Sequence, residues 1–402
     1  GEPLGEEEVV LTKKALGWEW PNHTFYVPAE VRERMDATHR GREARTAWEE
    51  RFAAWAERHP DLAEEWRLAW SGALPEGWDA DLPSWKPGEK EATRAAAGKA
   101  LNALAAKVPW LIGGDADLAG STKTTLKGEA DFNGQTGAGR NFHYGVREHG
   151  MGSITNGMAY HGGVRPFCAT FFVFSDYMRP AVRLAAMSGY KDIFSFTHDS
   201  VGLGEDGPTH QPVEHLASLR AMPGMRLIRP ADANETAAAW RVAIDSRGPT
   251  ALVLTRQNVP VLDGTDGAPV ERGAYVLVDP GGDGEPDLVL IGTGSEVGVC
   301  VEAATKLADA GLRTRVVSMP SWDLFAAQPD AYQDSVLPPE VPTLAVEAGA
   351  SLGWDRWADD SVSLDRFGAS APGAVALANL GFTPDNVAAR ARQLVDDLRE
   401  EA

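Results

Sequence analysis

A chain of 402 residues exceeds the usual size of one domain, so we expect two or three compact units. Its formal net charge of -20 argues against a nucleic-acid scaffold, because binding of phosphate backbones requires a basic face. An anionic substrate would therefore need a local cluster of cations within a repelling average field.

Residues 1–88 are acidic, rich in tryptophan and interrupted by prolines. Between residues 47 and 70, tryptophans and other apolar residues recur at largely helical spacing, with charged residues between them. This pattern predicts one or two amphipathic helices. Because the segment has no second layer to pack against, we expect it to dock onto a larger body, and a ligand-stacking face is the alternative interpretation.

From residue 93 the sequence alternates between helices and short apolar strands. Helices are predicted at 93–107 and 234–246, and residues 156–161 are predicted to be the end of another helix. The predicted strands are 110–113, 165–172, 192–197, 225–228 and 250–255. Such alternation predicts a parallel sheet that is covered by helices on both faces. Its functional sites should lie at the carboxyl ends of the strands.

Residues 260–286 are rich in turn-forming residues and predict a linker or a hairpin. A second α/β unit follows, with predicted strands at 287–291, 313–318 and 343–346 and predicted helices at 295–310 and 383–400. The expected fold class is therefore α/β, with two doubly wound, mostly parallel-sheet domains preceded by a helical tail. We place the domain boundaries at 1–88, 89–262 and 263–402.

The two cysteines, Cys168 and Cys300, lie far apart in the sequence, and Cys168 belongs to an apolar run. This usage is more typical of buried free thiols in a reducing compartment than of a disulfide framework. No run of about 18 apolar residues could cross a bilayer, and no charged-then-apolar start indicates export. We therefore expect a cytoplasmic protein.

Two motifs are the most specific features of the chain. GEDGPTHQP at residues 204–212, here called the signature loop, places a carboxylate and an imidazole between glycines on one tight turn, and YGVREHGM occupies residues 144–151. Together they resemble the transketolases, thiamine-diphosphate enzymes that transfer two-carbon ketol units between sugar phosphates. The resemblance extends from the first residues almost to the last.

Glu148 matches the family glutamate that hydrogen-bonds the N1′ nitrogen of the aminopyrimidine ring of the cofactor. The resemblance implies that this bond favours the imino tautomer, whose nitrogen removes the C2 proton of the thiazolium. Such proton sharing needs a carboxyl group in a dry pocket. Taken alone, Glu148 is typical of a helix cap or a salt-bridge residue, and the surrounding motif favours the catalytic role.

Phe171, Phe174 and Tyr177 follow a predicted strand at a spacing of three residues, so we expect them on one side of the helical turn that leaves it. The resemblance implies that this aromatic trio encloses the aminopyrimidine, with one ring stacking on it and the others excluding water. Without the motifs, an aromatic stripe of this kind is typical of a core.

On the signature loop, the resemblance implies that His210 contacts the carbonyl or hydroxyl oxygen of the substrate. Asp206 would then accept a hydrogen bond from the neighbouring hydroxyl. The alternative interpretation is a capped turn, because an Asp-Gly-Pro sequence strongly favours one.

Phosphate recognition falls, by the same resemblance, to Arg94, Ser121, His198 and Arg256. His198 and Arg256 follow predicted strands, and the ends of neighbouring strands converge, so these groups could bind a terminal phosphate by charge-assisted hydrogen bonds. Any one of them alone would suit an ordinary surface position. Asp117 resembles a family residue that lies near the cofactor.

Two other glycine motifs are interpreted as turns without a binding role. Gly282-Asp283-Gly284 resembles the start of the family's diphosphate and metal motif, but it precedes a predicted strand and lacks the downstream asparagine. GTGSE at residues 292–296 lacks the third glycine of a dinucleotide fingerprint.

The family's amino-terminal domain holds the diphosphate and a divalent metal, Mg²⁺ or Ca²⁺, and we find no part of its metal motif here. We therefore assign no metal ligand and expect residues 1–88 to be the C-terminal tail of that domain and a linker. Residues 89–262 would then form the pyrimidine-binding domain, and residues 263–402 the family's C-terminal domain. Because the chain starts with Gly1, we expect a processed or truncated product.

Active sites of the family form between subunits, so the resemblance implies a homodimer that acts on sugar phosphates of the pentose phosphate pathway. It implies no nucleic-acid or membrane partner. The leading hypothesis is transketolase, although the chain alone would be incomplete for catalysis. The alternatives are a relative similar to dihydroxyacetone synthase and a non-catalytic partner subunit or fragment.

Overall fold

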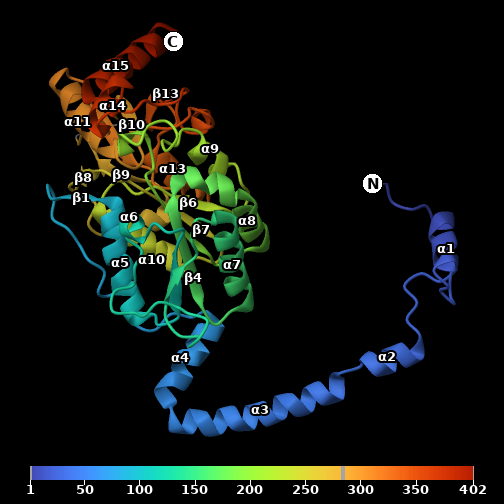
Figure 1. Ribbon diagram of the computed structural model, residues 1–402. Helices are drawn as coiled ribbons and strands as arrows, with labels where there is room; N and C mark the ends of the chain where they lie inside the picture. The colour runs from blue at the N-terminus through green and yellow to red at the C-terminus, as the bar shows by residue number, and fades with distance from the viewer. Residues whose placement is uncertain (1, 282–285, 402) are drawn as a thin grey trace. The chain divides into compact units, whose positions relative to one another are not determined.

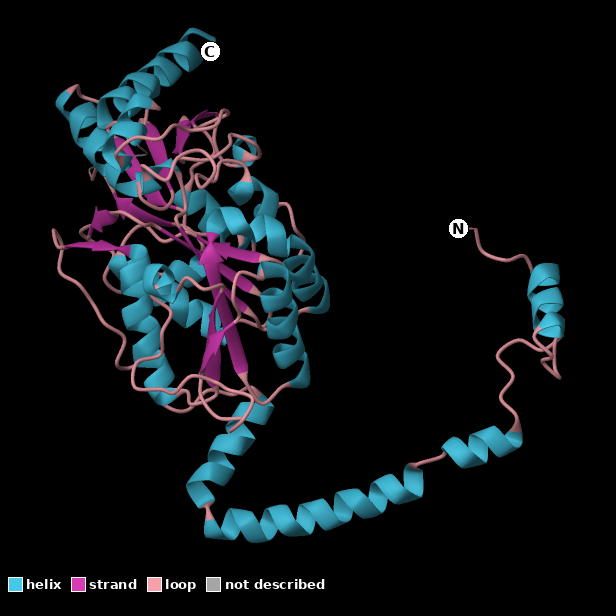
Figure 2. Cartoon of the chain, viewed as in Figure 1, coloured by secondary structure: helices cyan, strands magenta, loops and turns pink. Residues whose placement is uncertain are grey.

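The computed structural model describes residues 2–281 and 286–401, and the chain divides into two units, Gly1–Glu65 and Trp66–Ala402 (Figures 1 and 2). The first unit contains α1 (Glu6–Ala15), α2 (Ala29–Met35) and α3 (Thr38–Arg58). None of the residues in these three helices, all of which are described, is fully buried.

The helical pattern predicted between residues 47 and 70 is divided between two helices. α3 ends at Arg58 and α4 (Pro60–Ser71) begins at Pro60, because proline lacks an amide hydrogen and restricts the residue before it. At the end of α4, the centroid of the Trp70 ring lies 5.5 Å from that of His161. The prediction of one or two helices in this segment is confirmed.

The second unit begins its α/β fold with a parallel sheet of six strands, in the order β3-β2-β4-β5-β7-β6. The strands are β2 (Leu111–Asp115), β3 (Asn141–His143), β4 (Arg165–Phe171), β5 (Ile193–Thr197), β6 (Arg226–Ile228) and β7 (Thr250–Leu254). A short antiparallel ribbon of β1 (Lys90–Ala92) and β8 (Asn258–Pro260) lies beside it. The predicted parallel sheet is confirmed.

Helices cover both faces of this sheet, as the alternating pattern predicts (Figure 1). α5 (Thr93–Lys107) and α10 (Ala233–Asp245) pack together on one face, and α7 (Glu148–His161) and α8 (Ser175–Ser188) pack together on the other. The shorter helices are α6 (Ala119–Thr122), α9 (His215–Arg220) and the 3-10 turns η1 (Phe172–Phe174) and η2 (Val201–Leu203).

Each sheet face has its own core because neighbouring residues of a strand point in opposite directions. On β4, Phe167 packs against Trp240 of α10, with ring centroids 6.3 Å apart. The next residue, Cys168, belongs to the opposite core together with Met151 of α7. Because both faces of these strands are buried, β4 and β5 carry apolar residues on both faces and show no simple alternation of apolar and polar residues.

A second sheet of five strands has the order β13-β12-β10-β11-β9, and all its pairs are parallel except β9 with β11. The strands are β9 (Tyr275–Val278), β10 (Leu288–Gly292), β11 (Thr314–Ser318), β12 (Thr343–Val346) and β13 (Asp360–Val362). The helices are α11 (Glu296–Asp309), α12 (Trp322–Ala326), α13 (Asp330–Val336), α14 (Gly373–Asn379), α15 (Pro384–Glu401), η3 (Val270–Arg272) and η4 (Trp354–Arg356).

The predicted linker or hairpin at residues 260–286 needs correction, because this segment contains η3 and the edge strand β9. β9 has four residues, lies between glycine-rich turns and runs antiparallel to β11, so the repeating helix-strand pattern does not reveal it. The turn predicted at Gly282-Asp283-Gly284 lies outside the described residues. The other predicted elements of the two sheets match the observed bounds to within two residues.

Cys168 and Cys300 are buried and free, as the sequence predicts. Burial raises the pKa of the Cys168 thiol to about 12, which keeps it protonated and unreactive near neutral pH. Over the residues that the structure describes, no helix combines the length and the apolar composition that crossing a membrane requires.

A buried ion network joins the two sheets. Arg229, directly after β6, is fully buried and donates to Asp199 Oδ2 at distances of 2.7 and 3.0 Å. The same guanidinium donates to Glu296 Oε2 of α11 at 2.5 Å and to the carbonyl of Thr293 at 2.9 Å. Burial alone would lower the pKa of Arg229, but the charges of Glu296 and Asp199 outweigh burial and raise it.

A second ion pair crosses the same boundary between the sheets. Arg220 of α9 donates to both carboxylate oxygens of Glu347, at 2.7 Å each, and Glu347 directly follows β12. The Arg220 guanidinium also lies 3.9 Å from the ring centroid of Trp322. Both contacts fix the orientation of the second sheet relative to the first.

Replacing Arg229 by methionine should lower the free energy of unfolding by about 3 to 5 kcal/mol, because it leaves two buried carboxylates without their cation. Urea unfolding followed by circular dichroism measures this loss. Arg241→Met is the matched control, since Arg241 pairs with Glu271 at 3.4 Å on the surface and its loss should cost under about 1 kcal/mol. Equal losses in the two variants would show that the buried network contributes no more than a surface pair.

Candidate functional site

The predicted site residues follow the carboxyl ends of the strands of the six-stranded sheet. Asp117 follows β2, Phe171 ends β4, His198 follows β5 and Arg256 follows β7. Glu148 begins α7, the helix that follows β3. In a parallel sheet these ends lie along one edge, which is where α/β proteins bind ligands.

A pair of threonines brings two of the predicted cations together. Thr93 begins α5, and its amide donates to the Thr255 hydroxyl at 2.9 Å, while the Thr255 amide donates to the Thr93 hydroxyl at 2.7 Å. The residues that follow these threonines are Arg94 and Arg256. The reciprocal hydrogen bonds therefore fix the start of α5 beside the end of β7.

Arg94 and Arg256 lie close enough for the charge of Arg256 to act on Arg94. Burial lowers the pKa of Arg94, the positive charge of Arg256 lowers it further, and the carboxylate of Asp206 acts in the opposite direction. Arg94 also donates to the carbonyl of Ser121 at 2.7 Å. Ser121 therefore contacts this cluster through its backbone, and no described residue is hydrogen-bonded to its hydroxyl.

His198 is held in an unusual conformation at this edge. Its φ of 63° is in the left-handed region, which non-glycine residues rarely adopt outside sites that require it. Its ring stacks on Phe171 with centroids 3.7 Å apart, and Nδ1 lies 2.8 Å from the Thr197 hydroxyl. Burial, followed by the charges of Arg94 and Arg256, lowers the pKa of His198 to about 3, so the imidazole is neutral near pH 7.

The aromatic trio forms a row rather than one side of a single helical turn. Phe171 ends β4, Phe174 ends η1 and Tyr177 lies in the first turn of α8. The ring centroids of Phe171 and Phe174 are 5.8 Å apart at an interplanar angle of 12°, and those of Phe174 and Tyr177 are 6.1 Å apart. Tyr177 is 67% exposed, so this end of the row is open to a ligand or to another chain.

The signature loop brings its imidazole to the aromatic row. The His210 ring lies 5.5 Å from that of Phe174 and 6.4 Å from that of Phe171, edge-on in both cases. The Thr209 hydroxyl lies 2.9 Å from His210 Nδ1, and among the described residues none is hydrogen-bonded to Nε2, so this nitrogen is available to a ligand. The second imidazole of the site, His198, is close enough for His210 to lower its pKa.

Glu148 is buried, with 7% of its surface exposed, at the first position of α7. Among the described residues, none donates a hydrogen bond to its carboxylate. A buried carboxylate without a donor is costly unless a ligand supplies one. Glu148 is therefore available to a ligand nitrogen.

Asp117 has the fewest structural connections to the other predicted site residues. It is exposed, adopts a left-handed φ of 65°, and lies close enough to Asp115 to add to the effect of burial in raising the pKa of that carboxyl. The structure records no contact between Asp117 and the aromatic row among the described residues.

The structure also reveals residues that sequence reasoning missed. Gln211 Nε2 donates to the carbonyl of Gly204 at 2.9 Å and to that of Ala369 at 3.0 Å, and the Ser370 hydroxyl donates to the carbonyl of Glu205 at 2.6 Å. The five-stranded second sheet and its helices, here called the second α/β body, thus hold the signature loop. Gln211 lies inside the motif and could have been found, whereas Ala369 and Ser370 carry no local signal.

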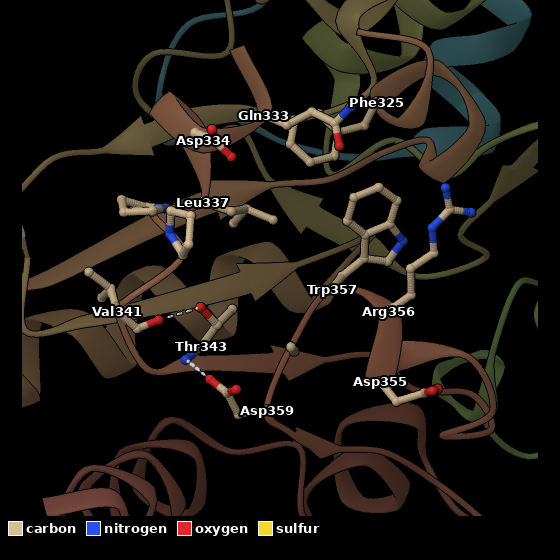
Figure 3. A pocket seen from close by; sticks show the side chains of 13 residues that line it. Phe325, Gln333, Asp334, Leu337, Val341, Thr343, Asp355, Arg356, Trp357 and Asp359 are labelled. Carbon is tan, nitrogen blue, oxygen red and sulfur yellow. Dashed lines mark hydrogen bonds between the residues drawn. The ribbon is translucent and has the colours of Figure 1, made fainter. Parts of the chain in front are cut away.

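A separate pocket of about 280 Å³ lies in the second α/β body, between α13 and the segment that contains Trp357 (Figure 3). Aromatic rings of Phe325 and Trp357 and the carboxylates of Asp334, Asp355 and Asp359 line it. None of the predicted site residues contributes to this pocket.

Three family models match the chain in succession. They are the thiamine diphosphate binding domain of transketolase at residues 1–75, its pyrimidine binding domain at residues 89–261, and the transketolase-like C-terminal domain at residues 273–383.

Relatives of known identity match the whole chain. The transketolase of Geobacillus stearothermophilus is 52% identical in an alignment of 407 positions that covers 98% of this chain and 60% of that protein. A transketolase structure from Pichia stipitis, in complex with sedoheptulose 7-phosphate, is 40% identical with a TM-score of 0.94 over 100% of this chain and 60% of that one. The chain thus spans about 60% of the length of these relatives.

Another solved structure belongs to a shorter chain, and the match covers nearly all of that chain. It is a split-gene transketolase described as an inactive β4 tetramer, with 25% identity and a TM-score of 0.64 over 76% of this chain and 98% of that one. The family models, the curated relatives and the fold agree with the resemblance carried by the two motifs: the chain belongs to the transketolase family.

Proposed function

We propose that this chain forms the pyrimidine-binding and C-terminal part of a transketolase that reversibly transfers a two-carbon ketol unit from a ketose phosphate to an aldose phosphate. The observation that carries the proposal is the placement of two imidazoles, an aromatic row and an arginine pair at one sheet edge. In a chain of net charge -20, that arginine pair supplies the local cation cluster that an anionic substrate needs.

The residues fit thiamine diphosphate in two respects. The Glu148 carboxylate has no donor among the described residues, so it can accept or share a proton with the N1′ nitrogen of the aminopyrimidine. Phe171, Phe174 and Tyr177 offer flat apolar surfaces that can pack against the same ring and exclude water. When bound, the cofactor supplies a thiazolium carbon that is nucleophilic toward a carbonyl group. We propose Asp117 as an additional cofactor contact.

The proposed substrate-binding residues form two groups, one for each end of the substrate. Arg94 and Arg256 would bind the terminal phosphate by charge-assisted hydrogen bonds, together with Ser121. His198 is neutral near pH 7, so it would join them as a hydrogen-bonding group rather than as a charge. At the reacting end, His210 would bond the carbonyl or hydroxyl oxygen and Asp206 the adjacent hydroxyl.

The diphosphate and its divalent metal, Mg²⁺ or Ca²⁺, would be held by the family's amino-terminal domain, of which the chain matches one model over residues 1–75. A homodimer with its active sites at the subunit interface is supported by an exposed apolar face on one side of α8. This face consists of Tyr177, Leu184 and Met187, which are 67%, 47% and 66% exposed. Because Tyr177 belongs to this face and to the aromatic row, a second subunit would cover the cofactor site. Buried free cysteines support a cytoplasmic location.

A second candidate is a subunit that has no activity by itself and needs a separate amino-terminal subunit. The split-gene structure supports this candidate, because it is described as an inactive β4 tetramer and is similar in fold to 76% of this chain. Ketol transfer by the 402-residue chain, measured with and without an added amino-terminal domain of the family, distinguishes the two candidates. A relative similar to dihydroxyacetone synthase would share this site and differ in its acceptor.

In the assembled enzyme, Arg256→Ala should raise KM for phosphorylated sugars by about one to two decades, because a hydrogen bond to a charged group contributes roughly 1.5 to 3 kcal/mol. Hydroxypyruvate has no phosphate, so its kinetics should change little. Steady-state kinetics with the two donors measure the difference, and His210→Ala should impair both. If Arg256→Ala weakened both donors equally, Arg256 would be structural and the sugar-phosphate assignment would lose its main support.

Glu148→Gln should preserve the fold and slow the exchange of the cofactor's C2 hydrogen by orders of magnitude, because an amide cannot share a proton with N1′. Proton NMR of the assembled enzyme in deuterated buffer follows this exchange. Glu340→Gln, at an exposed position of the second α/β body, is the control and should exchange normally. Near-normal exchange in Glu148→Gln would remove Glu148 from the cofactor site.

A further inference from the structure

A buried histidine lies between two exposed carboxylates where α8 meets α9. Asp176 is the second residue of α8, Glu214 immediately precedes α9, and His215 is the first residue of α9. One nitrogen of His215 and one oxygen of each carboxylate lie within 4.8 Å of one another. None of the three belongs to the proposed substrate or cofactor contacts.

The imidazole of His215 is only partly satisfied by its neighbours. Its side chain is 5% exposed, and Nε2 lies 3.1 Å from Asp176 Oδ2, at hydrogen-bond distance. Nδ1 is buried and has no hydrogen-bond partner among the described residues, although Glu214 Oε2 lies 3.7 Å away. The Phe172 ring packs 5.6 Å from the imidazole and fixes it in place. A buried nitrogen aimed at a carboxylate beyond hydrogen-bond reach calls for a third partner.

A separation of 3.7 Å is too long for a hydrogen bond but suits two ligands of one cation. Zn²⁺ binds imidazole nitrogen and carboxylate oxygen at about 2.0 to 2.2 Å, so an ion between Nδ1 and Glu214 would reach both atoms. A ligating histidine usually donates its other ring N–H to a carboxylate, which is the position of Asp176 at Nε2. Mg²⁺ and Ca²⁺ fit poorly, because they prefer a shell of oxygen ligands.

We propose that His215 and Glu214 bind a divalent transition-metal ion of the Zn²⁺ class, and that Asp176 orients the imidazole. Glu214 and Asp176 are each 60% exposed, so the ion can enter from solvent and keep water as its remaining ligands. The site would fasten the end of the signature loop, which Val213 joins to Glu214, to the helix that carries Tyr177. Binding of the ion at this site does not depend on catalytic activity.

Titration of the metal-free 402-residue chain with Co²⁺ near neutral pH tests the proposal, because Co²⁺ in such a site gives visible d–d absorption. We expect saturable binding in the micromolar range that Zn²⁺ displaces. His215→Gln and Glu214→Gln should each weaken binding at least tenfold, and Asp176→Asn should weaken it by roughly 10- to 100-fold. Circular dichroism checks that each variant is folded.

His143→Gln is the matched control, because His143 also lies 3.0 Å from an aspartate, Asp131, but on the surface and 59% exposed. Its Co²⁺ binding should equal that of the unaltered chain. The proposal is overturned if the unaltered chain shows no saturable Co²⁺ absorption, or if Glu214→Gln binds Co²⁺ as tightly as the unaltered chain does. Glu214 is exposed, so this variant should fold even if His215→Gln does not.

Discussion

The buried guanidinium of Arg229 is the contact on which the arrangement of the site depends. It bonds to Asp199, the residue after His198, and to Glu296, the first residue of α11 in the second sheet. A buried ion pair is not an efficient source of stability, because desolvation opposes the attraction between the charges. Its geometry is nevertheless strict, since neither carboxylate can leave the guanidinium without becoming an unpaired buried charge.

This network and the hydrogen bonds of the second α/β body together hold the signature loop in place. At the start of the segment, Asp199 is fixed by Arg229, and η2 then leads into the loop. Further along, Gln211 and Glu205 are bonded to Ala369 and Ser370 of the second α/β body. The second body thus presents His210 to the aromatic row, although no residue of that body belongs to the predicted site. This gives the C-terminal domain a positioning role in the chain.

The chemistry at the sheet edge follows from a small group of polar contacts in an acidic protein. The reciprocal bonds between Thr93 and Thr255 place two arginines side by side, although the charge of Arg256 and burial both disfavour the charged form of Arg94. A dianionic phosphate would relieve this repulsion. The same positive field, together with burial, keeps His198 neutral, so one cluster combines charge with a neutral hydrogen-bonding group.

Much of the fold and most of the candidate site could be predicted from local sequence. Apolar runs and helical spacing locate β4, β5 and α10, and the two motifs identify Glu148, Asp206 and His210. Edge strand β9 could not be predicted, because its four residues lie between turns and carry no periodic pattern. The Arg229 network could not be predicted for another reason, because its partners Asp199 and Glu296 are far apart in the sequence. In the sequence alone, a charged residue that will be buried cannot be distinguished from one that will lie on the surface.

Amide hydrogen exchange of residues 199–211 is the measurement that tests this account most directly. It should be compared between the unaltered chain and Glu296→Gln, which removes one charge from the network and keeps the shape of the side chain. We predict that protection of this segment falls more than tenfold while protection of β2 and β4 is unchanged. Unchanged protection of residues 199–211 would contradict the claim that the buried network positions the signature loop.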